Sequence, residues 1–263
     1  MRVIPKSIAT STLERQCVSY YKTANIRTSN GGIGMKLTSS KPTLDDNDNK
    51  KHSKNLKMAR YTLTYFDIRA RGEAIRLLFK YAGVEFKDVR IQRADWPKIK
   101  PTTPTGKLPY LEVDGKILPE SGAILRYLAR QFKLIGDNEL ETAFADSVVE
   151  TYRDFKANIR PYVHVSAGLA NGNADELYKD VYVPNRDIAF KYLESVLAKS
   201  ESDFIVDSGV TYADIFIAEH ITTLLYLDPS FEKALPQFVD YQQKVFALPQ
   251  IKDYVASRKV SKV

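Results

Sequence analysis

The chain of 263 residues has almost no cysteine, since Cys17 is the only one. A single thiol excludes an intrachain disulfide, a Cys-x-x-Cys redox pair and a zinc site built from cysteines. Histidine is also scarce, and His52, His164 and His220 do not have the spacing of metal ligands. We therefore expect no metal site, and we interpret His164 and His220 as packing residues of helices.

Long apolar segments are missing as well. The sequence contains no run of 18 apolar residues, no secretory signal segment and no Asn-x-Ser/Thr sequon. These absences argue against insertion into a membrane and against secretion. They predict an intracellular protein, and we expect a cytoplasmic location.

The net charge of +7 is unevenly distributed. Residues 1–57 hold 11 basic and 4 acidic side chains, which leaves 28 of each sign in the rest of the chain. Because this segment is rich in Ser, Thr and Asn and has weak apolar periodicity, we interpret residues 1–57 as a disordered basic extension. An organelle transit peptide and a wrongly assigned translation start are alternatives. The neutral remainder, without a basic stripe, argues against nucleic-acid binding.

The pattern in residues 58–134 predicts an α/β domain. We expect a strand over 59–66, a helix over 70–81, a strand over 85–91, a β-hairpin and a helix from Ser121. Asp114-Gly115, flanked by alternating apolar residues, indicates a type I′ hairpin turn. The order βαβαββα with a four-stranded mixed sheet is that of a thioredoxin-like domain.

The periodicity changes near residues 133–137, where we place a linker. From residue 138 to 263 we expect an all-helical domain with helices over 139–165, 174–199, 211–227 and 236–260. Thr211 and Asp214 have the spacing of a capping box before the apolar run that follows them. No strand is predicted in this domain.

Two backbone features of the first domain suit a peptide ligand. A residue that precedes proline is held extended, so the backbone of Leu108, before Pro109, could pair with an extended peptide. Ser121 is placed to cap the helix that follows it, and the first N–H groups of a helix attract a carboxylate. An anion site is expected there.

Together with this domain order, the segments LTYF, ADWPKIK, TGKLPYLEVDG and ESGAI resemble the cytosolic glutathione transferases, and the sigma class fits best. The resemblance covers the chain from Met58 onward. It implies a homodimeric enzyme that joins the thiolate of glutathione, its co-substrate, to small hydrophobic electrophiles without a further cofactor. Peroxide reduction and prostaglandin isomerisation are subsidiary activities that the resemblance suggests.

The resemblance also assigns roles to residues of the first domain. Tyr65 matches the tyrosine that donates its hydroxyl to the sulfur of glutathione, and Arg71 matches an arginine near the thiolate. We interpret the neighbouring Arg69 and Arg76 as solvated. The residues that match the rest of the glutathione site are Trp96 and Lys100 at the glycine end, Lys107 and Leu108 before a cis-Pro109, and Glu120 and Ser121 at the γ-glutamyl end.

Three positions concern the subunit interface and departures from the family pattern. Asp154 matches an acid that reaches the γ-glutamyl ammonium of the neighbouring subunit. Sigma-like members usually have glutamine where this chain has Glu120, which puts a negative charge beside the carboxylate that Ser121 should bind. Prostaglandin-isomerising members have an acid where this chain has Arg153, so their metal-assisted activation is not expected here.

The electrophile site is poorly specified by the sequence, and Tyr162 and His164 are candidate wall residues. A non-catalytic structural protein of the lens type, or a carrier of apolar ligands on the same scaffold, is the alternative function. A thiol-disulfide oxidoreductase would need a cysteine near the start of the first helix, and there is none.

Overall fold

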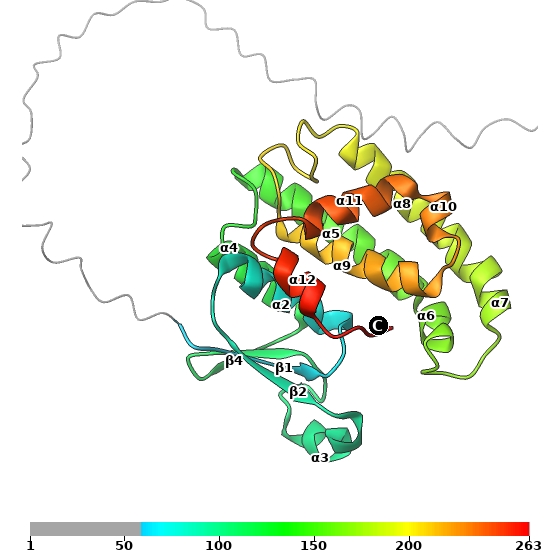
Figure 1. Ribbon diagram of the computed structural model, residues 1–263. Coiled ribbons are helices and arrows are strands. Elements are labelled where there is room, and N and C mark those ends of the chain that lie inside the picture. Colours follow the sequence, from blue (N-terminus) through cyan, green and yellow to red (C-terminus); the bar gives the residue numbers. More distant parts are fainter. Residues whose placement is uncertain (1–58, 263) are drawn as a thin grey trace, which may run out of the picture. The chain divides into compact units, whose positions relative to one another are not determined.

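The computed structural model describes residues 59–262 (Figure 1). The predictions for residues 1–57, with Cys17 and His52, lie outside the described residues. The elements of the first domain are β1 (Tyr61–Phe66), α2 (Ala70–Ala82), β2 (Lys87–Ile91), the short helices η3 (Arg93–Asp95), α3 (Trp96–Ile99) and η4 (Lys100–Thr102), β3 (Tyr110–Val113), β4 (Lys116–Pro119) and α4 (Ser121–Gln131). This order confirms the predicted thioredoxin-like domain.

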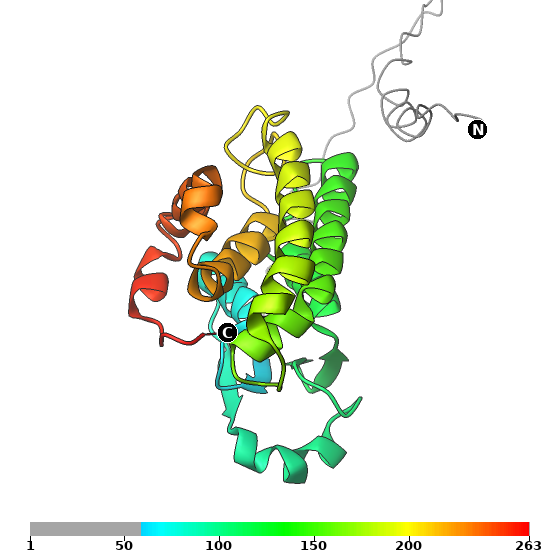
Figure 2. The same ribbon diagram turned by 90° about the vertical axis from the view of Figure 1, so that its right-hand side faces the viewer.

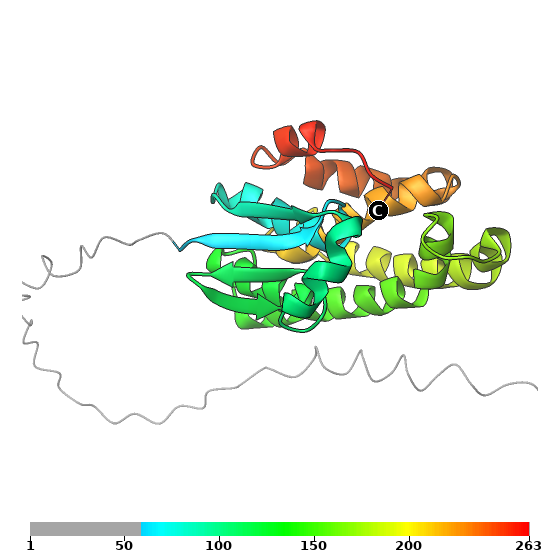
Figure 3. The same cartoon turned by 90° about the horizontal axis from the view of Figure 1, so that it is seen from below.

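The four strands form one sheet in the order β2-β1-β3-β4. β1 runs parallel to β2 and antiparallel to β3, and β4 is antiparallel to β3, as Figure 3 shows from below. Asp114 and Gly115 have φ values of 49° and 83°, and a type I′ turn requires a positive φ at both central residues. The Leu108–Pro109 peptide bond is cis, as predicted.

The second domain contains helices and no named strand among the described residues. Its elements are α5 (Glu139–Asn158), α6 (Arg160–Ser166), α7 (Ala174–Leu177), the π-helix η5 (Tyr178–Tyr182), α8 (Val183–Leu197), α9 (Tyr212–Leu227), α10 (Phe231–Ala234), α11 (Pro236–Phe246) and α12 (Lys252–Ser257). α5 and α8 lie side by side (Figure 2). The uninterrupted helices predicted over 139–165 and 236–260 are wrong, because each breaks near a proline, Pro161 or Pro249, which lacks a backbone N–H.

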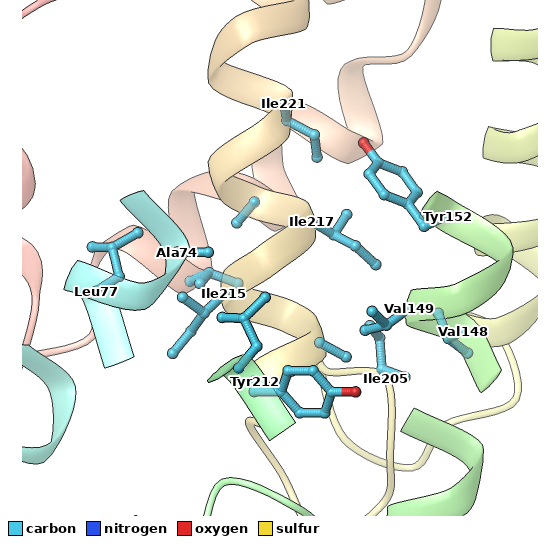
Figure 4. Close-up of a cluster of buried hydrophobic side chains, with 14 of the residues drawn as sticks. Ala74, Leu77, Val148, Val149, Tyr152, Ile205, Tyr212, Ile215, Ile217 and Ile221 are labelled. Atoms are coloured by element: carbon cyan, nitrogen blue, oxygen red, sulfur yellow. The ribbon is translucent and has the colours of Figure 1, made fainter. Parts of the chain in front are cut away.

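Helix α9 is the centre of the core. Its N-cap Thr211 and Asp214 form the predicted capping box, and the buried Asp214 carboxylate also accepts a hydrogen bond of 2.8 Å from the Tyr241 hydroxyl. Figure 4 shows Ala74 and Leu77 of α2 on one side of α9, with the α5 side chains on the other. The core is therefore continuous from the first domain into the second, which fixes α2 against the helical domain.

A chain of buried ion pairs also joins the two domains, and it corrects the expectation that Arg69 and Arg76 are solvated. Their exposed fractions are 4% and 0%. Arg69 pairs with Glu219 of α9 at 2.5 Å, and Glu219 pairs with Arg258 at 2.5 Å. Arg258 reaches Glu73 at 3.3 Å, and Glu73 pairs with Arg76 at 3.0 Å. Buried charges are stable only when paired, so this network holds the start of α2 in one position.

Candidate functional site

The candidate site lies at one end of the sheet. Thr64 pairs with Tyr110, and Tyr110 pairs with Pro119, so the end of β1, the start of β3 and the end of β4 are neighbours. The parallel strand β2 ends at the same edge, because Phe66 pairs with Ile91. The register therefore places Tyr65, the cis-proline, the start of α4 and the segment after β2 around one edge.

Among the predicted residues, Tyr65 has a hydroxyl group that is held in position for donating its proton. Its side chain is 5% exposed, and its hydroxyl oxygen accepts a hydrogen bond of 3.2 Å from the backbone N–H of Arg71. Burial raises the pKa of the hydroxyl, an effect that the Arg71 N–H and guanidinium partly offset. Tyr65 is therefore a neutral phenol at physiological pH, and its own proton remains available for donation.

The start of α2 approaches the Tyr65 ring very closely. A Cβ atom at Gly72 would lie 2.5 Å from the Cδ1 atom of Tyr65, so only glycine fits here. Ala70, the first residue of the helix, has a φ of +32°, a conformation that costs free energy for an L-residue with a side chain. No local sequence pattern identifies Gly72, because the clash is visible only once the ring is placed.

Trp96 and Lys100 lie on the short helices between β2 and β3. The Trp96 ring makes an edge contact with Phe66, the neighbour of Tyr65, with 5.3 Å between the centroids. A Cβ at Gly106 would lie 3.8 Å from the Lys100 Cε atom, so the Lys100 side chain passes the turn before the cis-proline. Lys107 is exposed and Leu108 half-buried in that turn.

The start of α4 differs from the prediction. Ser121 is the first helical residue, and Glu120 is the N-cap, with no side-chain capping hydrogen bond. The expectation that Ser121 caps the helix is therefore wrong: Glu120, with a φ of +69°, already makes the sharp turn into the helix. The Arg153 guanidinium of α5 lies against Gly122, where a Cβ would overlap it. No local sequence pattern indicates this contact.

The predicted residues of the second domain lie in different surroundings. Asp154 is exposed, and among residues 59–262 its carboxylate has no ion pair. Tyr162, a candidate wall residue, is instead a core residue: it is 4% exposed and donates a 2.5 Å hydrogen bond to the Leu227 carbonyl. His220 is buried as predicted, at 3.0 Å from the Tyr152 hydroxyl.

His164, the other candidate wall residue, lines a cavity of about 420 Å³ with Arg160, Pro161, Val165 and Leu177. Burial lowers the pKa of the His164 imidazole, and the cationic Arg160, Arg93 and Arg71 lower it further. His164 is therefore close enough to Arg71 of α2 for the charge of that arginine to affect its pKa. The lining combines apolar side chains with the Arg160 guanidinium.

Within residues 59–262, no group of three or more His, Cys, Asp and Glu side chains could hold a metal ion. The same part of the chain contains no helix with the length and apolarity needed to cross a membrane. The site is thus built from a phenol, backbone groups, one indole and several cations.

Comparisons with known proteins show the family of the chain. Family models for the glutathione S-transferase N-terminal and C-terminal domains match residues 61–130 and 161–258. Glutathione S-transferase 1 of Ascaris suum is 46% identical over 76% of this chain and 98% of its own length. The crystal structure of a glutathione S-transferase from Ascaris lumbricoides is 45% identical, with a TM-score of 0.74 over 78% of this chain and all of its own.

A Nu-class enzyme from Haemonchus contortus is 38% identical, with a TM-score of 0.72 over 78% of this chain and all of its own. The similarity in each case spans both domains and nearly the whole of the relative. The chain belongs to the glutathione S-transferase family.

Proposed function

We propose that this glutathione S-transferase ionises glutathione at Tyr65 and transfers the thiolate to an apolar electrophile. The observation that carries the proposal is the hydrogen bond from the Arg71 N–H to the Tyr65 oxygen. Because the oxygen accepts from the backbone, the hydroxyl proton is directed away from it, and a bound sulfur atom can accept that proton in a hydrogen bond. The Arg71 side chain adds positive potential.

The free energy needed is modest. A thiol has an ordinary pKa of about 8.5, and lowering it by one unit requires about 1.4 kcal/mol of preferential stabilisation of the thiolate. A charge-assisted hydrogen bond contributes about 1.5–3 kcal/mol. One phenol, helped by a nearby guanidinium, is therefore enough to make the thiolate the main form near neutral pH.

The remaining residues are proposed to hold the tripeptide along the sheet edge. The Trp96 indole and the Lys100 and Lys107 ammonium groups suit the glycine carboxylate, and the backbone of Leu108 before cis-Pro109 suits the cysteinyl unit. At the other end, Ser121 at the start of α4 suits the γ-glutamyl carboxylate and Glu120 its ammonium.

The cavity beside His164 is proposed to bind the electrophile, because it combines apolar walls with a place near Arg71. A homodimer in which Asp154 completes the neighbouring site remains a prediction, supported by the exposure of this carboxylate. The sigma-like class, a cytoplasmic location and the peroxidase or isomerase activities are also predictions, and the Nu-class relative offers a second class assignment.

The test is Tyr65→Phe, with Tyr226→Phe on the exposed face of α9 as a matched control. The expected result is loss of the thiolate absorbance of the glutathione complex near pH 7 and a fall in turnover only in Tyr65→Phe. Glutathione should also change the fluorescence of Trp96, the only tryptophan of the chain. Equal turnover in wild type and Tyr65→Phe would support the carrier function instead.

A further inference from the structure

Lys156 has a position that the glutathione site does not explain. It lies on α5, is half-buried, and its Nζ atom is 4.8 Å from the centroid of the Phe216 ring of α9. Within residues 59–262 its ammonium has no hydrogen bond and no ion pair. A cation held over an aromatic ring, without an anionic partner and with only partial access to water, is available to a ligand.

The charged and titratable groups that face Lys156 come from three elements. Arg69 and Arg71 stand at the start of α2, Arg153 lies one turn earlier on α5, and Glu219 and His220 belong to α9. Burial lowers the pKa of the Lys156 ammonium to about 7; Glu219 opposes the shift, and the three arginines add to it. Glu219 is already paired with Arg69 and Arg258, so these two arginines largely neutralise its charge.

Two observations indicate which side of α5 the amine occupies. Arg71, whose charge acts on Lys156, donates its backbone N–H to the Tyr65 hydroxyl. Arg153, one helical turn before Lys156, lies against Gly122 at the start of α4. The face of α5 that carries both residues is thus directed at the helix starts that surround the glutathione site.

We propose that the Lys156 ammonium is a catalytic acid for electrophiles that are α,β-unsaturated ketones or aldehydes, donating its proton to their carbonyl oxygen. The proposal rests on the glutathione transferase function described above. Ala157, the residue next to Lys156 on α5, lines the cavity proposed for the electrophile, so Lys156 lies next to that cavity, with its ammonium over the Phe216 ring.

The addition of the thiolate to such a substrate needs no further reactant. The thiolate sulfur forms a bond to the β-carbon, the π electrons of the C=C bond shift toward the carbonyl, and negative charge develops on the oxygen. The Lys156 Nζ–H proton passes to that oxygen, and the neutral amine regains a proton from water. The enol then becomes the saturated thioether by ordinary tautomerisation. An acid whose pKa lies near the working pH suits this transfer.

The experiment compares two electrophiles with the full-length enzyme. trans-4-Phenyl-3-buten-2-one develops negative charge on oxygen, whereas 4-nitrobenzyl chloride loses chloride and does not. The measured quantity is the ratio of kcat/KM for the enone to kcat/KM for the benzyl chloride, because thiol ionisation cancels in it. The variants are Lys156→Met, Lys156→Arg and, as a control on the exposed side of α8, Lys191→Met.

In Lys156→Met we expect the ratio to fall by about tenfold or more, with Lys191→Met as in wild type. In wild type the ratio should fall as the pH rises through the pKa of the amine. That decline should be absent in Lys156→Met and, since arginine stays protonated, also in Lys156→Arg. A wild-type ratio in Lys156→Met, or the same pH dependence in that variant, would overturn the proposal.

The experiments distinguish a failure of the Tyr65 proposal from a failure of the Lys156 proposal. If Tyr65→Phe turns over the benzyl chloride as fast as wild type, the thiolate assignment is wrong, whatever the ratio does. If Tyr65→Phe lowers both rates but Lys156→Met does not change the ratio, the thiolate assignment stands and Lys156 only packs on Phe216. Thermal unfolding of each variant checks that the fold is retained.

Discussion

Gly72 offers the sharpest test of how Tyr65 is held. In Gly72→Ala the new Cβ would lie 2.5 Å from Cδ1 and 3.0 Å from Cγ of the Tyr65 ring, whereas ordinary contact begins near 3.4 Å. The ring and the helix start must therefore separate by about 1 Å. The ring is 5% exposed and packs against Phe66, and the buried ion pairs of Arg69 hold the helix start.

Because packing holds the Tyr65 ring and ion pairs hold the start of α2, the new contact should displace the Tyr65 hydroxyl relative to the sulfur position. A misplacement of about 1 Å in a catalytic geometry costs on the order of 100-fold in rate. Overpacking of this kind also destabilises a core by about 1–3 kcal/mol. We expect Gly72→Ala to lower kcat/KM about 100-fold and to raise the pKa of bound glutathione toward its value in water.

The assay is the thiolate absorbance of the glutathione complex as a function of pH, with turnover and chemical denaturation measured on the same preparations. Gly83→Ala is the matched control: Gly83 follows the other end of α2 with a φ of +63°, and no atom lies within 4 Å of the place where its Cβ would stand. It should lose about 1 kcal/mol of stability and keep its thiolate. A wild-type thiolate titration in Gly72→Ala would refute the reasoning.

Three further predictions concern stability. Ala70→Gly should raise the free energy of unfolding by about 0.5–1 kcal/mol, because glycine relieves the positive φ; a loss in urea denaturation would contradict this. Glu219→Gln leaves the buried Arg69 without a carboxylate and Arg258 with only Glu73, and should cost about 3–5 kcal/mol, whereas Glu232→Gln on the surface should cost little. Lys259 and Arg90 lower the pKa of Asp67 to about 2. Since a lowered pKa stabilises the fold above the ordinary value of 3.8, wild type should exceed Asp67→Asn by about 1 kcal/mol at neutral pH, after allowance for solvent. This difference should vanish as the pH falls from 4 to 2; a constant difference would argue against the pairing.

The predictable part of the fold is local. Asp114-Gly115 needs two positive φ values for its turn, and the capping box of Thr211 and Asp214 needs only a helix start, so neighbouring residues specify both. The prediction that the Leu108–Pro109 bond is cis rested on the family resemblance, since a peptide bond before proline generally favours trans. The four-stranded mixed sheet could be predicted because a βαβ crossover and a hairpin permit few arrangements.

The contacts that hold the site could not be predicted, because they join distant parts of the chain. Arg69 and Glu219 are 150 residues apart, and nothing near either residue indicates a partner. An arginine with no visible partner is by default a surface residue, and that expectation was wrong for Arg69. The lowered pKa of Lys156 could not be predicted for a related reason: it comes first from burial and in part from Arg71 and Arg69, which are distant in the sequence.

The γ-glutamyl end shows how two departures from the family pattern, each unfavourable alone, become compatible in three dimensions. In the sequence, Glu120 puts a negative charge beside the carboxylate that Ser121 should bind, and Arg153 replaces an acid on another helix. The structure brings the Arg153 guanidinium against Gly122, next to Ser121. A ligand carboxylate bound at the start of α4, as proposed above, would therefore meet a cation from α5 as well as the helix N–H groups, which would offset the charge of Glu120. Glu120 would then be free to pair with the ligand ammonium, so that charge at this end would balance across two domains.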